Sequence, residues 1–156
     1  MRTEIRIVPA GEEEMRVVQE LWREYWQGLN LAADFQNFAR ELESLPGVYA
    51  PPEGRLLLAW KDDEAAGTAA LRRLNGRACE AKRLYVRPRF QGAGIGRALL
   101  TRLREEARAA GYREMYGDTL ESMQGALELY SRFGFQRVEL YSADPTPGAI
   151  FLRLEL

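Results

Sequence analysis

Three glycines at alternate positions, Gly92, Gly94 and Gly96, constrain the fold of this chain more than any other feature. They lie between a β-like run, residues 82–86, and an amphipathic helical pattern that begins at Ile95. A glycine-rich helix start leaves backbone N–H groups unpaired, and the missing Cβ atoms let an anion approach them closely. The segment therefore predicts a phosphate-binding turn. An ordinary strand-to-helix turn is the simpler alternative, although one turn rarely requires three alternate glycines.

The residues around these glycines discriminate between known phosphate-binding motifs. A P-loop requires Gly-Lys-Ser/Thr, whereas Gly96 is followed by Arg97 and Ala98. A Rossmann loop requires G-x-G-x-x-G, and its third glycine position holds Arg97 or Leu99, depending on where the motif starts. The pattern Q/R-x-x-G-x-G/A is matched at every required position, by Gln91, Gly92, Ala93, Gly94, Ile95 and Gly96.

Apolar spacing along the rest of the chain predicts a mixed α/β domain. Strands are expected at residues 3–10, 54–61, 64–75, 78–86, 112–120, 136–141 and 149–156, and helices at 12–29, 33–45, 95–110 and 122–133. The expected order is β-α-α-β-β-β-α-β-α-β-β, with the three middle strands forming an antiparallel meander. With no internal repeat or linker, residues 1–156 are expected to form one domain.

Composition argues against several classes of partner. A net charge of -1 provides no basic field for nucleic acid or anionic lipid. No apolar run approaches the roughly 20 residues that span a bilayer, and the N-terminus lacks the apolar core of a signal peptide, so a cytoplasmic protein without membrane contact is expected. Cys79, the only cysteine, cannot form an intramolecular disulfide and is expected to be a buried thiol.

The chain contains no histidine, which restricts the chemistry available to it. Ser-His-Asp and Cys-His catalysis are excluded, as is every zinc site that uses histidine. The commonest general base in enzymes is therefore also missing.

The glycine motif, the preceding "LYV", the following helix and the segment "ALELYSRFGF" resemble the GNAT superfamily of N-acetyltransferases over nearly the whole chain. The ending "DPTPGAIFLRLEL" is similar to that of a bacterial subgroup of acetyltransferases. The resemblance implies the GNAT fold, a mixed, mostly antiparallel sheet of about seven strands with four helices. It also implies acetyl-CoA as co-substrate, no metal, and direct transfer in a ternary complex to a primary amine of a small molecule or peptide.

Two other functions are compatible with these motifs. A non-catalytic acyl-CoA-binding or sensing domain would retain the glycines but would not need a catalytic tyrosine or glutamate. Acceptance of a longer acyl chain depends on the volume of the pocket. The sequence does not identify the amine, nor does it decide between a monomer and a homodimer.

The resemblance assigns the binding of acetyl-CoA to two adjacent segments. In GNAT proteins the strand before the loop diverges from the next strand, and pantetheine inserts between them. Backbone groups of the strand would then bind pantetheine and polarise the thioester carbonyl, while the loop would bind the pyrophosphate. The residues that match are Leu84, Tyr85, Val86, Gln91, Gly92, Ala93, Gly94, Ile95, Gly96 and Arg97.

The resemblance also assigns two catalytic residues. Glu80 matches a position where several GNAT enzymes have a catalytic glutamate, with Asp118 and Glu121 as weaker candidates for the base. Tyr130 matches the tyrosine that protonates the leaving thiolate. Met123 stands where the family often has an asparagine that contacts CoA, so one such contact is expected to be missing.

Aromatic residues of the first helical region are expected to flank the acceptor, although core packing is the simpler explanation for each of them. The predicted wall consists of Trp22, Tyr25 and Trp26 with Phe35 and Phe38, and of Tyr141 with the loop at 145–148 on the opposite side.

Overall fold

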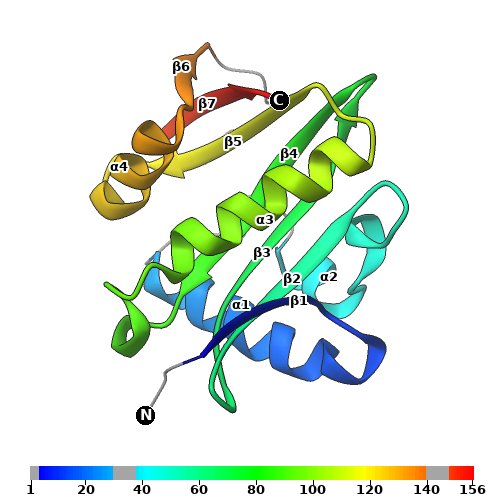
Figure 1. Cartoon of the computed structure of the whole chain (residues 1–156), viewed down its shortest axis with the longest axis vertical. Coiled ribbons are helices and arrows are strands. Elements are labelled where there is room, and N and C mark those ends of the chain that lie inside the picture. The colour runs from blue at the N-terminus through cyan, green and yellow to red at the C-terminus, as the bar shows by residue number, and fades with distance from the viewer. Residues whose placement is uncertain (1–3, 30–37, 140–147) are drawn as a thin grey trace.

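The structure is a computed structural model of the whole chain and describes residues 4–29, 38–139 and 148–156. Its strands are β1 (Ile5–Pro9), β2 (Arg55–Lys61), β3 (Glu64–Asn75), β4 (Ala78–Val86), β5 (Glu114–Leu120), β6 (Gln136–Val138) and β7 (Ala149–Glu155). Its helices are α1 (Met15–Gly28), α2 (Phe38–Glu43), α3 (Ile95–Ala109) and α4 (Gln124–Phe133). The predicted order of elements is confirmed (Figure 1).

The strands form one seven-stranded sheet in the order β1-β2-β3-β4-β5-β7-β6. Every neighbouring pair is antiparallel except β4 and β5, which are parallel. The two parallel strands are connected by α3, as a parallel pair requires a crossover connection. Among the described strands, the one parallel pair lies near the centre of the sheet, next to the predicted phosphate loop.

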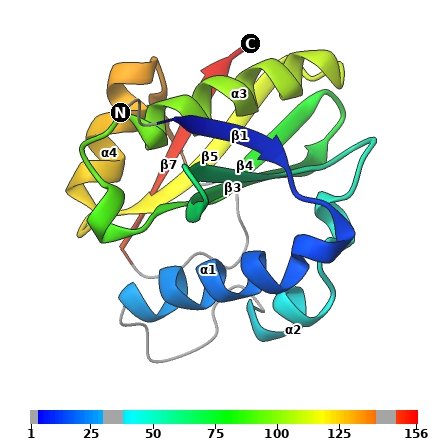
Figure 2. The same ribbon diagram turned by 60° about the horizontal axis from the view of Figure 1, so that its bottom comes forward.

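Helices cover both faces of the sheet, as Figure 2 shows: α1 and α2 lie on one face, and α3 and α4 on the other. The core under α3 and α4 is built from residues such as Leu99, Leu103 and Met115. The core under α1 and α2 contains Leu21 and Trp22 among others. Two separate cores thus fix the helices on opposite sides of the central parallel pair.

Cys79 lies in the core under α3, which confirms its prediction as a buried thiol. Burial raises the pKa of Cys79 to about 12. The thiol therefore stays protonated at neutral pH and has the character of a small apolar side chain.

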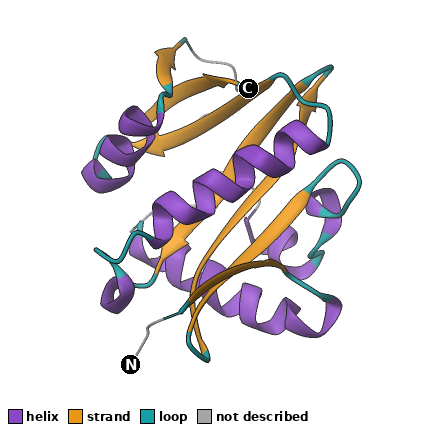
Figure 3. Ribbon diagram, viewed as in Figure 1, coloured by secondary structure: helices purple, strands orange, loops and turns teal. Residues whose placement is uncertain are grey.

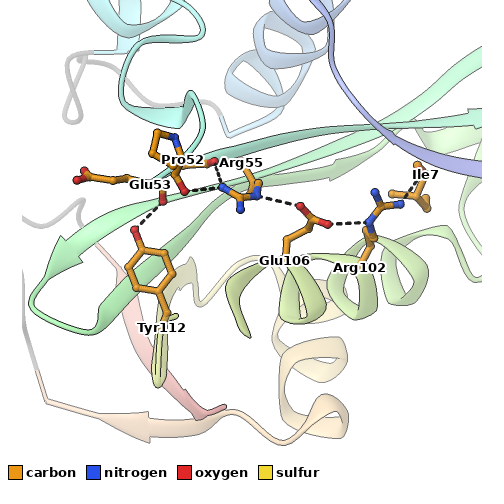
Figure 4. Close-up of polar contacts among 8 residues, drawn as sticks. Ile7, Pro52, Glu53, Arg55, Arg102, Glu106 and Tyr112 are labelled. Carbon is orange, nitrogen blue, oxygen red and sulfur yellow. Dashed lines mark hydrogen bonds and ion pairs between the residues drawn. The ribbon is translucent and has the colours of Figure 1, made fainter. Parts of the chain in front are cut away.

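A network of charged side chains fixes α3 against the first two strands (Figure 4). Glu106 accepts hydrogen bonds from Arg55 Nε of β2 at 2.9 Å and from Arg102 Nε of α3 at 3.2 Å. Arg102 also donates to the backbone carbonyl of Ile7 in β1 at 2.9 Å. Glu106 and Arg102 therefore link the C-terminal half of α3 to two strands, which orients the helix whose N-terminus carries the glycine loop (Figure 3).

We expect Glu106→Gln to lower the free energy of unfolding at pH 7 by about 1–2 kcal/mol, since it weakens two charge-assisted hydrogen bonds. Burial opposes ionisation of Glu106, but the hydrogen bonds from Arg102 and Arg55 outweigh it and hold the pKa below its usual range. A lowered carboxylate pKa stabilises the fold above the unfolded pKa, and this stabilisation is lost as the pH falls through the folded pKa. Urea unfolding should therefore show the variant and parent converging as the pH falls below about 4.

Glu105→Gln is the matched control for this experiment, because Glu105 is the exposed neighbour of Glu106 in the same helix. Its urea midpoint should stay close to that of the parent both at pH 7 and below about pH 4. Equal losses in the two variants would mean that the helix charge, rather than the network, determines the effect.

Candidate active site

The central strands separate in the middle of the sheet. The parallel ladder between β4 and β5 ends at the pair Ala81 and Gly117, although both strands continue beyond it. Arg87 N–H donates to the Ala66 carbonyl of β3 at 2.8 Å. Because the pairs of an antiparallel ladder alternate, the amide and carbonyl of the adjacent Val86 point away from β3. The backbone edge of β4 therefore faces a gap that no strand of the described residues fills.

The glycine loop occupies the open end of this gap. Gly92 and Gly94 have φ angles of +84° and +81°, a region that side-chain-bearing residues adopt only with strain. Gly94 is the N-cap of α3, and its carbonyl accepts the hydrogen bond of Ala98 N–H at 3.0 Å. The amides of Ile95, Gly96 and Arg97, which precede Ala98, belong to the first turn of the helix and have no acceptor within it. The start of α3 therefore has backbone amides without intrahelical acceptors, which the predicted anion-binding turn requires.

A groove runs from the loop along β4 to α4, with a volume of about 410 Å³. We call it the loop groove. It is lined by Leu84, Tyr85, Val86, Gln91, Gly92, Gly94, Ile95, Gly96, Arg97, Met123, Gly125, Ala126 and Leu129. Nine of the ten residues predicted to bind acetyl-CoA thus line one surface; Ala93 is the exception.

Two contacts of the loop explain its residue types. The side chain of Gln91 donates to the Val86 carbonyl at 3.1 Å, which ties the loop back to the end of β4. A Cβ atom on Gly96 would lie 3.1 Å from Leu129 Cδ2, closer than ordinary van der Waals contact. The third glycine therefore permits α3 and α4 to approach each other beside the groove.

A second hollow, which we call the Tyr130 cavity, lies beside the separated strands. Its lining residues are Tyr25, Leu29, Ala81, Lys82, Arg83, Leu84, Asp118, Thr119, Leu120, Met123, Ala126 and Tyr130. Three of these, Leu84, Met123 and Ala126, also line the loop groove. The cavity and the groove therefore meet at these shared residues.

Tyr130 projects from α4 and is almost completely buried. Its ring packs edge-on against Phe135, with centroids 5.0 Å apart. Burial, together with the nearby Tyr25 and Asp118, raises the pKa of Tyr130 above its ordinary value. The hydroxyl is therefore protonated at neutral pH, and Tyr130 lines a cavity that shares residues with the groove, as a proton donor would require.

The predicted base, Glu80, does not line the Tyr130 cavity. It is buried beneath Lys82 and Arg72: Arg72 Nε donates to Glu80 Oε1 at 2.9 Å, and Lys82 Nζ lies 3.9 Å from Oε2. Asp118 does line the cavity, and its Oδ1 lies 3.7 Å from Lys82 Nζ. Lys82 thus bridges an inner carboxylate and an outer one, and only the outer one borders the cavity.

The aromatic residues predicted for the acceptor wall occupy different environments. Tyr25 lines the Tyr130 cavity. Trp22 has no exposed surface and packs edge-on against Tyr49, so its place is in the core, and Trp26 stacks on Phe38 with centroids 4.6 Å apart. Phe35 and Tyr141 lie outside the described residues.

Arg83 explains the arrangement of these rings. Its guanidinium lies 5.2–5.6 Å from the ring centroids of Trp22, Trp26 and Phe38, and it forms an ion pair with Glu41 of α2. The residue has a φ angle of +58° and lies in a β-bulge, where it and Leu84 both face Ala69. The bulge turns the Arg83 side chain toward α1 and α2.

Lys82, Arg83 and Asp118 acquire their importance from the structure. The sequence pattern assigned no role to Lys82 or Arg83, and Asp118 ranked below Glu80 as a candidate base. The one local signal was a pair of adjacent cations inside a strand whose other residues are mostly apolar. Their common cavity depends on the separation of β4 and β5, which no sequence pattern displays.

Two classes of feature are absent from the described part of the chain. Within residues 4–29, 38–139 and 148–156, no helix is both long and apolar enough to cross a membrane. Over the same ranges, no three cysteine, aspartate or glutamate side chains gather closely enough to hold a metal ion.

The sequence matches the Acetyltransferase (GNAT) family over residues 15–135, a range that contains every residue lining the groove and the cavity. It is 37% identical over 139 residues to an N-acetyltransferase of Schizosaccharomyces pombe, covering 87% of this chain and 85% of that protein. A GNAT-family acetyltransferase from Staphylococcus aureus superposes with a TM-score of 0.84 at 21% identity, covering 97% of this chain and 99% of the other. An acetyltransferase from Salmonella typhimurium, solved with its cofactor acetyl-CoA, superposes with a TM-score of 0.72 at 22% identity, covering 97% and 93%.

Proposed function

Because this chain belongs to the GNAT family of acetyltransferases, we propose that it transfers the acetyl group of acetyl-CoA directly to a primary amine of a small molecule or peptide. The observation that carries the proposal is the meeting of the loop groove and the Tyr130 cavity at Leu84, Met123 and Ala126. Direct transfer in a ternary complex requires the two substrates to lie side by side, and the shared lining residues put the loop groove next to the cavity that Tyr130 lines.

The loop groove would bind acetyl-CoA mainly through backbone groups. The amides at the N-terminus of α3 would donate to the pyrophosphate, because the helix dipole and the unpaired N–H groups both favour an anion there. Pantetheine would lie along the open edge of β4. The amides of Leu84 and Val86 are the proposed donors to this arm, and one of them would stabilise the oxyanion that forms from the thioester carbonyl.

The transfer step requires one proton acceptor and one proton donor. The neutral amine attacks the thioester carbonyl carbon, a C–N bond forms, and the C–S bond then breaks. The proton lost by the amine goes to a carboxylate, directly or through water, and the departing thiolate takes a proton from the Tyr130 hydroxyl. An alkylamine has a pKa of about 10.4 and is mostly protonated at neutral pH, so the acceptor of its proton controls the concentration of the reactive form.

We propose that this acceptor is the carboxylate pair formed by Asp118 and Glu80, with Asp118 in the leading role because it lines the cavity. Asp118→Asn is expected to lower kcat/KM at neutral pH by roughly 10-fold, with recovery as the pH approaches the pKa of the amine. Glu80→Gln should have a smaller effect on the rate, since Arg72 already occupies one oxygen of Glu80. Full pH–rate profiles of both variants test this order, and a larger, pH-dependent loss in Glu80→Gln would make Glu80 the leading base.

The function itself is tested by the release of free thiol from acetyl-CoA, measured over a panel of amines, amino acids and peptides. We expect release that depends on the acceptor, together with an acetylated product detected by mass spectrometry. Tight binding of acetyl-CoA without acceptor-dependent release from any member of the panel would contradict the proposal.

A further inference from the structure

The second half of α1 is joined to the end of β4 by two charged side chains, Glu24 and Arg87. We propose that Glu24 is a positioning residue for acetyl transfer. By pairing with Arg87, it would keep the Tyr25 wall of the Tyr130 cavity in a fixed position relative to the end of β4, where acetyl-CoA is proposed to bind. The inference rests on the proposed transfer and adds a residue that lines neither hollow.

The second half of α1 has few apolar anchors of its own. The fully buried residues of the helix are Val18, Leu21 and Trp22, all within residues 15–22. None of residues 23–28, all of which the structure describes, is fully buried. A segment with few buried apolar contacts opens at a low cost in free energy. The position of this segment, which carries Tyr25, therefore depends on its polar and half-buried contacts.

Glu24 and Arg87 contact each other at two points. Arg87 Nε donates to Glu24 Oε1 at 3.0 Å, and Arg87 Nη2 donates to Oε2 at 2.7 Å. The third nitrogen of the guanidinium, Nη1, donates to the Ala65 carbonyl of β3 at 3.0 Å. The hydrogen bond from Arg87 holds the pKa of Glu24 below its usual range, so both partners are charged at neutral pH. A two-point pair between planar groups fixes orientation as well as distance.

Glu24 is also connected to the walls of the two hollows. Its Oε1 accepts a hydrogen bond from the Tyr85 hydroxyl at 3.2 Å. The ring of Tyr85 packs edge-on against that of Tyr25, with centroids 6.1 Å apart. Tyr85 lines the loop groove, whereas Tyr25 lines the Tyr130 cavity. Glu24 thus contacts the ring of one wall and directly precedes the ring of the other in the helix.

An effect of Glu24 on the reaction would be indirect, through the position of α1. A displacement of about 1 Å, caused by a change far from the reacting atoms, can lower a rate by about 100-fold. The ladder with β3 holds β4 in place without Glu24, and the glycine loop makes no contact with this residue in the described part of the chain. Losing the pair should therefore disturb the acceptor side and leave the binding of CoA intact.

The test begins with Glu24→Gln, which keeps the size of the side chain and removes its charge. We expect kcat/KM for the acceptor to fall by about 10- to 100-fold, while calorimetry shows a nearly unchanged Kd for CoA. Hydrogen exchange, measured by mass spectrometry, should become faster in residues 23–28. Arg87→Lys keeps the charge but cannot form the two-point pair, so it should reproduce most of the kinetic loss.

Glu114→Gln is the matched control, because Glu114 also accepts hydrogen bonds from a tyrosine hydroxyl and an arginine Nε. The donors are Tyr116 at 2.9 Å and Arg153 at 3.1 Å. The side chains of Glu24 and Glu114 are 34% and 38% exposed, and Glu114 lines neither hollow. This variant should therefore keep the kinetics of the parent and the parent rate of exchange in α1.

The inference is overturned if Glu24→Gln keeps the parent kcat/KM or the parent exchange in residues 23–28, or if Glu114→Gln loses as much activity. A loss of CoA affinity that accounts for the kinetic loss would also overturn it, as would parent-like kinetics in Arg87→Lys. Faster exchange in Glu24→Gln, without thiol release by the parent for any acceptor, would support the role of the pair in holding α1 while contradicting the proposed transfer. The two failures are therefore distinguishable.

Discussion

Replacing Gly94 with valine is expected to weaken the binding of acetyl-CoA by at least about 100-fold. Gly94 has a φ angle of +81° at the N-cap of α3, and a β-branched residue does not adopt this conformation without strain. The loop would move toward negative φ, and the amides after Gly94 would no longer converge on one point. Each hydrogen bond to a charged phosphate contributes about 1.5–3 kcal/mol. The loss of two of them therefore lowers the affinity by at least about 100-fold.

Gly111→Val separates the loss of binding from a loss of stability. Gly111 lies just beyond the other end of α3, has a φ angle of +91°, and has open space around the position of a Cβ atom, as Gly94 does. The same substitution should therefore impose a similar strain, about 1–2 kcal/mol or more, without touching the loop groove. Calorimetry should show parent-like affinity for CoA in Gly111→Val but not in Gly94→Val. Unchanged affinity in a folded Gly94→Val protein would show that the pyrophosphate binds elsewhere.

Local patterns in the sequence were sufficient to predict the elements and the loop. The predicted order of strands and helices is confirmed, because amphipathic spacing and turn residues are local signals. The segment from Gln91 to Arg97 combines a motif with a helix start, and both are visible within a few residues. The GNAT resemblance and the expectation of an acetyl-CoA-dependent N-acetyltransferase are likewise confirmed by the family match and the named relatives.

The partners of the charged residues could not be predicted in the same way. Glu80 and Asp118 lie on different strands, and their ranking depends on which side chain borders the cavity. That in turn depends on the end of the β4–β5 ladder at Ala81 and on the bulge at Arg83. Both are properties of strand pairing across distant segments. A burial pattern alone also does not distinguish a core tryptophan such as Trp22 from one that lines a pocket.

Tyr130→Phe, which removes the hydroxyl, should lower kcat by about 100-fold. The phenyl ring keeps the edge-on contact with Phe135, so the change removes a proton donor without opening a cavity in the core. Burial raises the pKa of Tyr130, so the parent hydroxyl should stay protonated beyond the ordinary tyrosine range near 10. The alkaline limb of the parent pH–rate profile should accordingly not report ionisation of this residue.

The kinetic test divides the effect of Tyr130→Phe between kcat and the KM for acetyl-CoA. A donor that acts only as the C–S bond breaks should change kcat and leave this KM nearly constant, whereas a rise in KM alone would mean that the hydroxyl only binds CoA. Tyr112→Phe is the matched control, because Tyr112 is also a largely buried residue and its hydroxyl donates to the Glu53 carbonyl at 2.6 Å, away from both hollows. It should lower stability by about 1 kcal/mol and preserve kcat. If Tyr130→Phe turns over the true acceptor at the parent rate, then water protonates the thiolate and Tyr130 is only a core residue.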